Sequence, residues 1–200
     1  MLEQLRSGRG RLAAAAGIVA GALVLRLWGI GHGLPYVYNA DENAHFVPRA
    51  VGMFGHSYDP GYFINPPAYT YLLHLAFDLR WGGREAVGDA LAADRTSVFE
   101  LARVVAALLG TLAVALLLWA GRRLLGAGAG LVAGALLAVA FLPVHYSHLA
   151  LNDVPALAGV CLTLVGVAAI YRRNGLGGYA LAGAALGVAC ATKYTAGILV

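Results

Sequence analysis

Charged residues are scarce in this 200-residue sequence, at 12% of the total, whereas 60% of the residues are hydrophobic. An ordinary soluble domain has about 25% charged residues, so the composition indicates an integral membrane protein. The 14 lysines and arginines are divided among short loops and the ends of apolar runs. Because no clustered basic face results, the sequence excludes a typical nucleic-acid-binding protein, and we attribute its positive charge to membrane topology.

Cysteine is also rare, since the sequence has only Cys161 and Cys190, both within apolar stretches. Their apolar surroundings and wide separation argue against a CxxC zinc site and a disulfide framework, and we interpret both as packing residues. The sequence likewise has no glycine-rich phosphate-binding loop and no serine, histidine and aspartate in the order of a catalytic triad. The candidates for chemistry are therefore the few ionisable residues beside apolar segments, where a charge is costly unless it faces a cavity or a partner.

Five long apolar runs are present, each close to the ~20 residues that a helix needs to cross a ~30 Å hydrocarbon core. Their continuous apolar character excludes alternating membrane strands. The basic start also fits a cleavable signal sequence, but no small-residue cleavage site follows it, and we prefer an uncleaved span. We predict an all-α fold, a polytopic transmembrane helix bundle with spans at about 12–30, 101–119, 124–142, 154–171 and 177–200.

The stretch 31–98 is long and polar, but it contains aromatic and apolar patches. We predict an outer loop with two or three short helices in the plane of the membrane interface. Pro66 and Pro67 cannot lie inside a helix, so a helix should begin near Ala68. Because the sequence ends within an apolar run, we expect residues 1–200 to be the N-terminal part of a longer transmembrane domain.

Glycines at positions 126, 130 and 134 repeat at a spacing of four, which predicts close contact between helices in lipid. Packing is their favoured interpretation.

The basic residues predict the orientation of the chain. They precede the first span (Arg6, Arg9, Arg11) and follow the second and fourth spans (Arg122, Arg123, Arg172, Arg173). If the spans alternate, all of these lie on one side, which the positive-inside rule makes cytoplasmic. The region from Gly31 to Val98, with seven acidic residues against four arginines, then lies on the other side.

This topology brings four distant residues to the non-cytoplasmic face. Asp41 and Glu42 follow the first span, Asp153 precedes the fourth, and Lys193 lies seventeen residues into a span that starts inside. Each also has a structural interpretation: the acids can stabilise helix N-termini, Asn152 or Asp153 can cap the fourth span, and Lys193 can reach the surface. We favour a shared site because the four residues converge.

Other polar residues extend this candidate site. Arg26 interrupts the first span near the outer face and can bind a lipid headgroup or another anion. His145 and His148 are spaced i, i+3 and, with Asp153, give a weak signal for a metal site. We predict no metal or other cofactor, although a divalent metal stays open as an alternative.

Four motifs in order resemble one family: LRLWGI leading to NADENAH, then INPPAYTYLL, SHLALNDVPA and ACATKYTAG. Together they resemble the membrane-embedded GT-C glycosyltransferases, especially the protein O-mannosyltransferases and the bacterial transferases related to the aminoarabinose transferase acting on lipid A. The resemblance covers essentially all 200 residues. One departure is Asn65, which stands where relatives often have lysine or histidine.

The resemblance implies transfer of a sugar, mannose or similar, from a polyprenyl-phosphate donor to an acceptor hydroxyl on the non-cytoplasmic face. Asp41 would be the base in a single, inverting displacement; a retaining route would need a second nucleophile. Glu42 and Asp153 would orient the acceptor or a cationic partner, and cations would hold the phosphate. The expected substrate-binding residues are Lys193, Arg26, Arg49, Asn65, His148 and Asn152.

The expected partners are the lipid-linked donor, membrane lipids and a protein, glycolipid or polysaccharide acceptor. We expect a multi-pass protein of a bacterial or archaeal plasma membrane. Two alternatives are a transporter-like module, whose charges would lie near mid-membrane, and a non-catalytic lipid-binding module.

Overall fold

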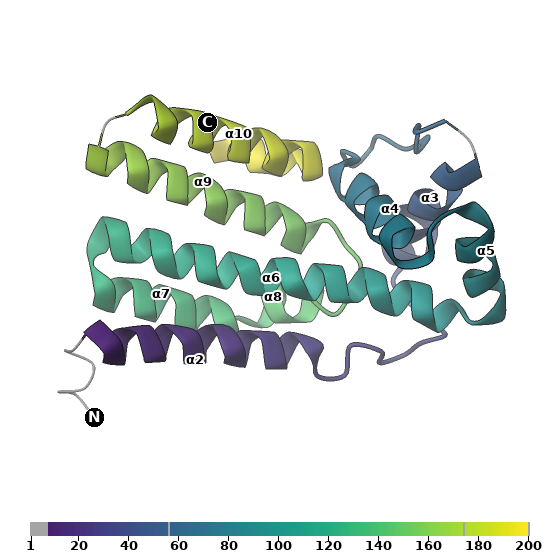
Figure 1. Cartoon of the computed structure of the whole chain (residues 1–200), viewed down its shortest axis with the longest axis horizontal. Helices are drawn as coiled ribbons and strands as arrows, with labels where there is room; N and C mark the ends of the chain where they lie inside the picture. The colour runs from purple at the N-terminus through teal and green to yellow at the C-terminus, as the bar shows by residue number, and fades with distance from the viewer. Residues whose placement is uncertain (1–7, 56, 174, 200) are drawn as a thin grey trace.

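A bundle of helices forms one part of the molecule, and a smaller group of helices covers one end of it (Figure 1). The computed structural model describes residues 8–55, 57–173 and 175–199. Arg6 lies outside the described residues. Apart from turns and loops, these residues form helices, and the predicted all-α fold is confirmed. The bundle consists of α2 (Gly8–Leu27), α6 (Arg95–Leu125), α7 (Ala127–Val139), α9 (Asp153–Arg173) and α10 (Leu176–Thr192).

The bundle helices differ in length. Among the described residues, α2, α6 and α9 are long and apolar enough to cross a membrane, whereas α7 and α10 are shorter apolar helices of 13 and 17 residues. At 1.5 Å per residue, α7 is only about 20 Å long. It ends because Ala140 is extended and a separate short helix, α8 (Phe141–Tyr146), follows. Each predicted span thus contains a helix, while three helices reach spanning length.

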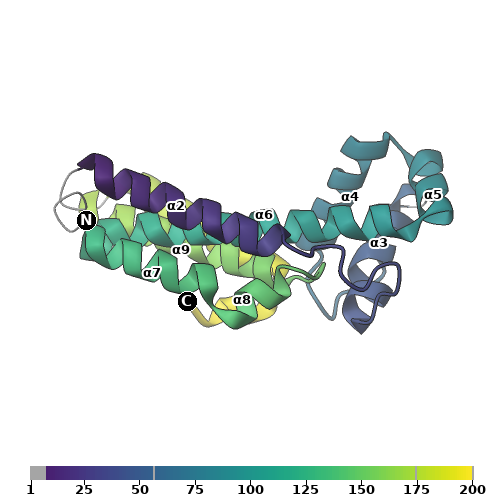
Figure 2. The same cartoon turned by 90° about the horizontal axis from the view of Figure 1, so that it is seen from below.

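Helix α6 joins the two parts of the molecule. Its 31 residues make it about 46 Å long, and in Figure 2 it continues from the bundle into the smaller group of helices. It begins earlier than the predicted span because the Asp94 side chain accepts a hydrogen bond of 2.9 Å from the backbone N–H of Thr96. Hydrogen bonds from the side chain and the backbone of Thr96 lower the pKa of Asp94. The added N-terminal turns give the outer helices a surface to pack on.

The outer helices are α3 (Val47–Gly52), α4 (Ala68–Trp81) and α5 (Arg84–Ala93), with single turns at η1 (Glu42–Phe46) and η2 (Met53–Gly55). Helix α4 begins where the two prolines predict, with Pro67 at its N-cap. One apolar core unites these elements with the start of α6 and includes Phe46, Leu73, Phe77, Val87 and Phe99. The stretch 31–98 therefore forms a packed cap.

Tyr69 anchors α4 to α6 inside this core. Its hydroxyl donates to the carbonyl oxygen of Ala102 at 3.2 Å, and the residue is 1% exposed. Burial, and secondarily the negative charge of Glu42, raises the pKa of the phenol far above its ordinary value. The hydroxyl therefore stays protonated and remains a donor.

A buried ion pair connects the cap to the bundle. The Glu42 carboxylate accepts from Arg103 Nε at 2.7 Å and from Nη2 at 2.9 Å, and neither side chain is appreciably exposed. Glu42 also accepts from the backbone N–H of Ala150 at 2.9 Å. The remaining Nη1 of Arg103 donates to the carbonyl oxygens of Ile30 and His32. This pair joins η1, α6 and the segments after α2 and α8.

The α6–α7 contact depends on glycine. A Cβ on Gly130 would lie 2.5 Å from the backbone nitrogen of Arg122, and a Cβ on Gly134 would lie 3.0 Å from Leu118 Cβ. Two of the three regularly spaced glycines thus pack against α6, as predicted. Gly126 instead forms the turn between the helices, with φ of +98°.

Replacing Glu42 with alanine should destabilise the protein by about 3–5 kcal/mol, because Arg103 would remain buried without a counter-charge. Thermal unfolding of the purified protein in detergent measures the loss. Glu85→Ala, at an exposed glutamate of α5, is the matched control and should stay within about 0.5 kcal/mol. Equal unfolding temperatures for the two variants would contradict a structural role for the pair.

Gly130→Ala should lower the unfolding temperature, with a cost of about 1–3 kcal/mol, because α6 and α7 would have to separate. Gly128→Ala is the control within the same helix, since nothing lies within 4 Å of a Cβ built there. The control should be neutral or slightly stabilising. If both substitutions had the same effect, close backbone contact at Gly130 would not hold the helices together.

Candidate functional site

The candidate site lies where the beginning of α9 and the end of α10 meet the cap. In Figure 1 these two helices run in opposite directions, and the last turns of α10 approach α4. Asn152 links the two helices, since its Nδ2 donates to the carbonyl oxygen of Thr192 at 2.8 Å. The alternating directions predicted from the arginines thus bring residues forty positions apart into contact.

Asp153 and Lys193 form an ion pair at this junction. Asp153 is the first residue of α9, and Lys193 directly follows α10. The ammonium nitrogen lies 2.5 Å from Asp153 Oδ1, and the side chains are 35% (Asp153) and 30% (Lys193) exposed. The pair is therefore accessible to a ligand, in contrast to the fully buried Glu42.

A chain of polar contacts runs from this junction into the cap. Nδ2 of Asn152 also lies 3.3 Å from Asn65 Oδ1, and Nδ2 of Asn65 donates to the hydroxyl of Tyr62 at 3.0 Å. Tyr194 adds a second link, because its hydroxyl donates to the carbonyl oxygen of Phe63 at 3.2 Å. The segment around Tyr62 is thereby fixed against the bundle end.

Tyr62 extends the chain to Asp41. Its ring stacks on His45, with ring centroids 4.3 Å apart and planes 9° from parallel. His45 Nε2 in turn lies 3.8 Å from Asp41 Oδ1, one helical turn away. The guanidinium of Arg49 lies 5.8 Å from the Tyr62 ring centroid, and its Nη1 donates to the carbonyl oxygen of Pro60 at 3.1 Å.

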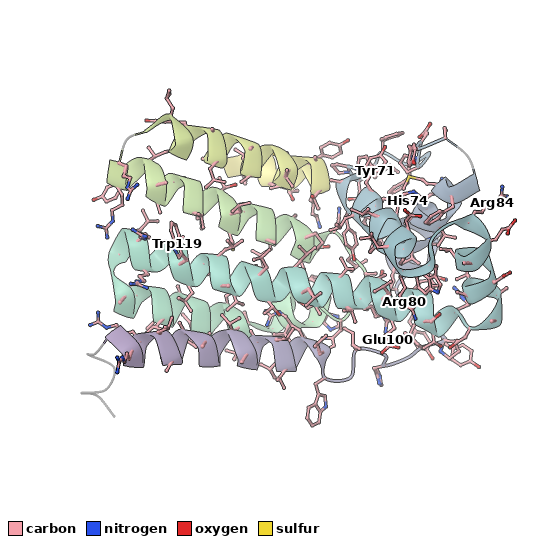
Figure 3. All side chains as sticks on the ribbon, in the orientation of Figure 1. Tyr71, His74, Arg80, Arg84, Glu100 and Trp119 are labelled. Atoms are coloured by element: carbon pink, nitrogen blue, oxygen red, sulfur yellow. The ribbon has the colours of Figure 1, made fainter. Side chains whose placement is uncertain are left out.

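Helix α4 contacts both the loop that leads to Tyr62 and helix α3. Figure 3 labels Tyr71 and His74 on α4. The hydroxyl of Tyr71 donates to the carbonyl oxygen of Tyr58 at 2.9 Å, and His74 Nδ1 lies 3.0 Å from the carbonyl oxygen of Ala50. These contacts orient the loop that carries Tyr62 relative to η1, whose N-cap residue is Asp41.

The two adjacent acids, Asp41 and Glu42, have opposite environments. The Asp41 side chain is 57% exposed, while Glu42 is inaccessible and bound to Arg103. Backbone N–H groups of both residues donate to Asn39 Oδ1, at 3.0 Å and 3.1 Å, which fixes the start of the turn. Only Asp41 of this pair presents a carboxylate that an acceptor can approach.

Arg26 and His148 lie apart from the Asp41–Lys193 chain of contacts. Arg26 is completely buried and donates to the carbonyl oxygens of Ala22 and Ala138, each at 3.1 Å, which completes hydrogen bonds at the end of α7. His148 contacts the carbonyl oxygens of Val144 and Trp28. Their predicted ligand roles stay predictions, and the contacts give both residues a structural role.

Sequence reasoning missed three residues of this arrangement. His45 has a recognisable signal, since it follows Asp41 by four positions, and Arg103 is a charge within an apolar run. Tyr62 has no comparable signal, because only the folded loop places it between His45 and Asn65. Among the described residues, no three histidine, cysteine or acidic side chains are grouped as metal ligands.

Comparison with protein families matches residues 95–200 to dolichyl-phosphate-mannose-protein mannosyltransferase. The matched region begins at the first residue of α6 and includes both Asp153 and Lys193. Comparisons with curated proteins and with solved structures found no match.

The family match covers more than half of the chain and agrees with the apolar helices of the bundle. This is the family type that the four ordered motifs resemble. The chain is therefore an integral membrane protein with a GT-C fold, and it belongs to the dolichyl-phosphate-mannose-protein mannosyltransferase family of membrane glycosyltransferases.

Proposed function

We propose that the protein transfers a sugar, mannose or similar, from a polyprenyl-phosphate donor to an acceptor hydroxyl, with Asp41 as the catalytic base. The observation that carries this proposal is the chain of contacts from exposed Asp41 through His45, Tyr62 and Asn65 to Asn152, which directly precedes Asp153 of the Asp153–Lys193 pair. An accessible carboxylate at one end of these contacts and an accessible cation beside the other end support the proposal. Family membership supplies the glycosyl-transfer chemistry.

The reaction requires a proton acceptor near the attacking hydroxyl. Asp41 removes the acceptor proton as the oxygen attacks the anomeric carbon, the bond from that carbon to the phosphate oxygen breaks, and the polyprenyl phosphate leaves with the bonding electrons. One displacement inverts the anomeric centre. His45 is a positioning residue in this scheme, because its Nε2 lies 3.8 Å from Asp41 and Tyr62 fixes its ring.

The leaving phosphate requires positive charge. Lys193 has three N–H donors, of which one is directed to Asp153. The others would bind phosphate oxygens, while Asp153 holds the ammonium group in place. Arg49 would add a second cation, since its Nη1 already fixes it against the Pro60 carbonyl oxygen. Such groups stabilise the negative charge that grows on the departing phosphate.

Two amides lie between the base and the cation. Asn65 and Asn152 contact each other at 3.3 Å and can exchange this contact for hydrogen bonds to sugar hydroxyls. Because Asn65 stands where the resembled family often has a cation, we assign phosphate binding to Lys193 and sugar contacts to Asn65. The acceptor is proposed to be a protein, as in the name of the matched family.

Charge distribution supports a site on the non-cytoplasmic face. Arginines at the opposite end of the bundle flank the start of α2 and the ends of α6 and α9 (Arg9, Arg11, Arg122, Arg123, Arg172, Arg173). The acidic residues that the structure describes lie between positions 41 and 100 or at 153. The positive-inside rule then orients Asp41 and Lys193 away from the cytoplasm.

Asp41→Asn should reduce sugar transfer by about 10²- to 10⁴-fold or more, because the amide cannot accept the proton. The full-length protein is assayed with a radiolabelled polyprenyl-phosphate sugar, with and without acceptor. Asp78→Asn, an exposed position on α4, is the matched control and should keep normal turnover. Normal turnover by Asp41→Asn would remove Asp41 from the mechanism, and donor transport without transfer would favour a transporter.

Lys193→Ala should weaken donor binding chiefly, because a phosphate contact stabilises the bound donor and the transition state together. Measuring turnover at increasing donor concentrations gives kcat and KM separately. We expect a large rise in the KM for the donor and a modest change in kcat. Lys193→Arg should recover part of the affinity. An unchanged donor KM in Lys193→Ala would contradict the phosphate role.

A further inference from the structure

A cavity lies at the end of the bundle away from the cap, between the C-terminal ends of α6 and α9. Its volume is about 230 Å³. Figure 3 shows Trp119 on α6 at this end of the molecule. The cavity is lined by Trp119, Arg123, Ala168, Ala169, Arg172 and Arg173.

Three arginines surround an apolar floor in this cavity. Arg123 lies over the Trp119 ring, with its guanidinium carbon 4.9 Å from the ring centroid. Arg172 Nε donates to the carbonyl oxygen of Arg123 at 2.9 Å, which ties the end of α9 to the end of α6. Guanidinium groups bind phosphate oxygens through paired donors, and alanines with an indole suit the apolar part of a lipid.

Helix-end stabilisation explains only part of this arrangement. Arginines near a helix C-terminus interact favourably with its dipole and terminal carbonyls. That role accounts for the Arg172 contact, but it does not require a cavity with an apolar floor between the two helix ends. Leu125 and Tyr171, neighbours of these arginines in the sequence, are 79% and 76% exposed. Exposed apolar and aromatic side chains beside arginines are typical of the membrane interface.

We infer that this cavity binds the headgroup of an anionic phospholipid. The phosphodiester lies among Arg123, Arg172 and Arg173, and the glycerol backbone rests against Trp119 and the two alanines. Basic pockets between membrane helices on the cytoplasmic side favour anionic headgroups, at about fivefold in affinity for each basic residue near the membrane surface. The site lies at the opposite end from Asp41 and is independent of the proposed reaction.

Native mass spectrometry of the purified full-length protein tests the inference, with phosphatidylglycerol and phosphatidylcholine added in separate titrations. Phosphatidylglycerol should bind more tightly, and Arg123→Gln and Arg173→Gln should each weaken it about fivefold. Arg122→Gln is the matched control. It removes the same charge from the same end of α6, but Arg122 does not line the cavity. It should change binding by less than about twofold.

A second variant tests the cavity without altering charge. Ala169→Leu fills the floor and should abolish tight phosphatidylglycerol binding while circular dichroism shows the same helix content. Equal losses in Arg122→Gln and Arg173→Gln, equal binding of the two lipids, or normal binding by Ala169→Leu would each overturn the inference. Displacement of the lipid by inorganic phosphate at equal concentration would overturn the assignment to a lipid.

Discussion

The buried pair of Glu42 and Arg103 is the interaction on which the placement of the cap depends. Two charges removed from water are costly unless each finds enough partners. Here Arg103 reaches the carboxylate and the carbonyl oxygens of Ile30 and His32, while Glu42 also accepts from Ala150. These partners belong to four separate segments of the chain. An apolar contact would bury similar area, but it would not specify which atoms must meet, so the pair fixes the relative positions of the segments.

This constraint also explains why two neighbouring carboxylates have different roles. Adjacent side chains of a helical turn point in different directions, and Glu42 is directed toward α6 while the Asp41 side chain is exposed. The Asp41 carboxylate is open to solvent and to an acceptor, whereas the Glu42 carboxylate is fully used as the counter-charge of buried Arg103. The structural role of Glu42 therefore supports the catalytic role proposed for Asp41, because it holds the turn from which Asp41 projects.

Local patterns in the sequence predicted the helices and their directions, since apolar runs and flanking arginines are local features. The direction of the helices alone predicted that Asp153 and Lys193 lie at the same end of the bundle, where they form an ion pair. Long-range partners could not be predicted in this way: Arg103 pairs with a residue 61 positions away, and Arg26 bonds to a carbonyl 112 positions away. The length of α7 was also missed, because its apolar run continues past the extended residue Ala140 into α8. Sequence patterns identified the polar residues, but only the contacts in the folded structure show which of them are accessible to a ligand.

The separation of charge along the molecule bears on how an anionic donor would be held. Acidic residues of the described chain gather around the cap, so the long-range field there does not attract a phosphate, and salt screens it beyond about 10 Å. Recognition must then come from short contacts to a cation already in position. Lys193 fits this requirement, because Asp153 holds its ammonium group while leaving it about one-third exposed. The Asp153 carboxylate also gives Lys193 an oppositely charged partner at the edge of an apolar bundle before a donor binds. The ion pair of Asp153 and Lys193 is thus compatible with phosphate binding, because Asp153 holds the ammonium group that would bind the phosphate and also supplies its counter-charge.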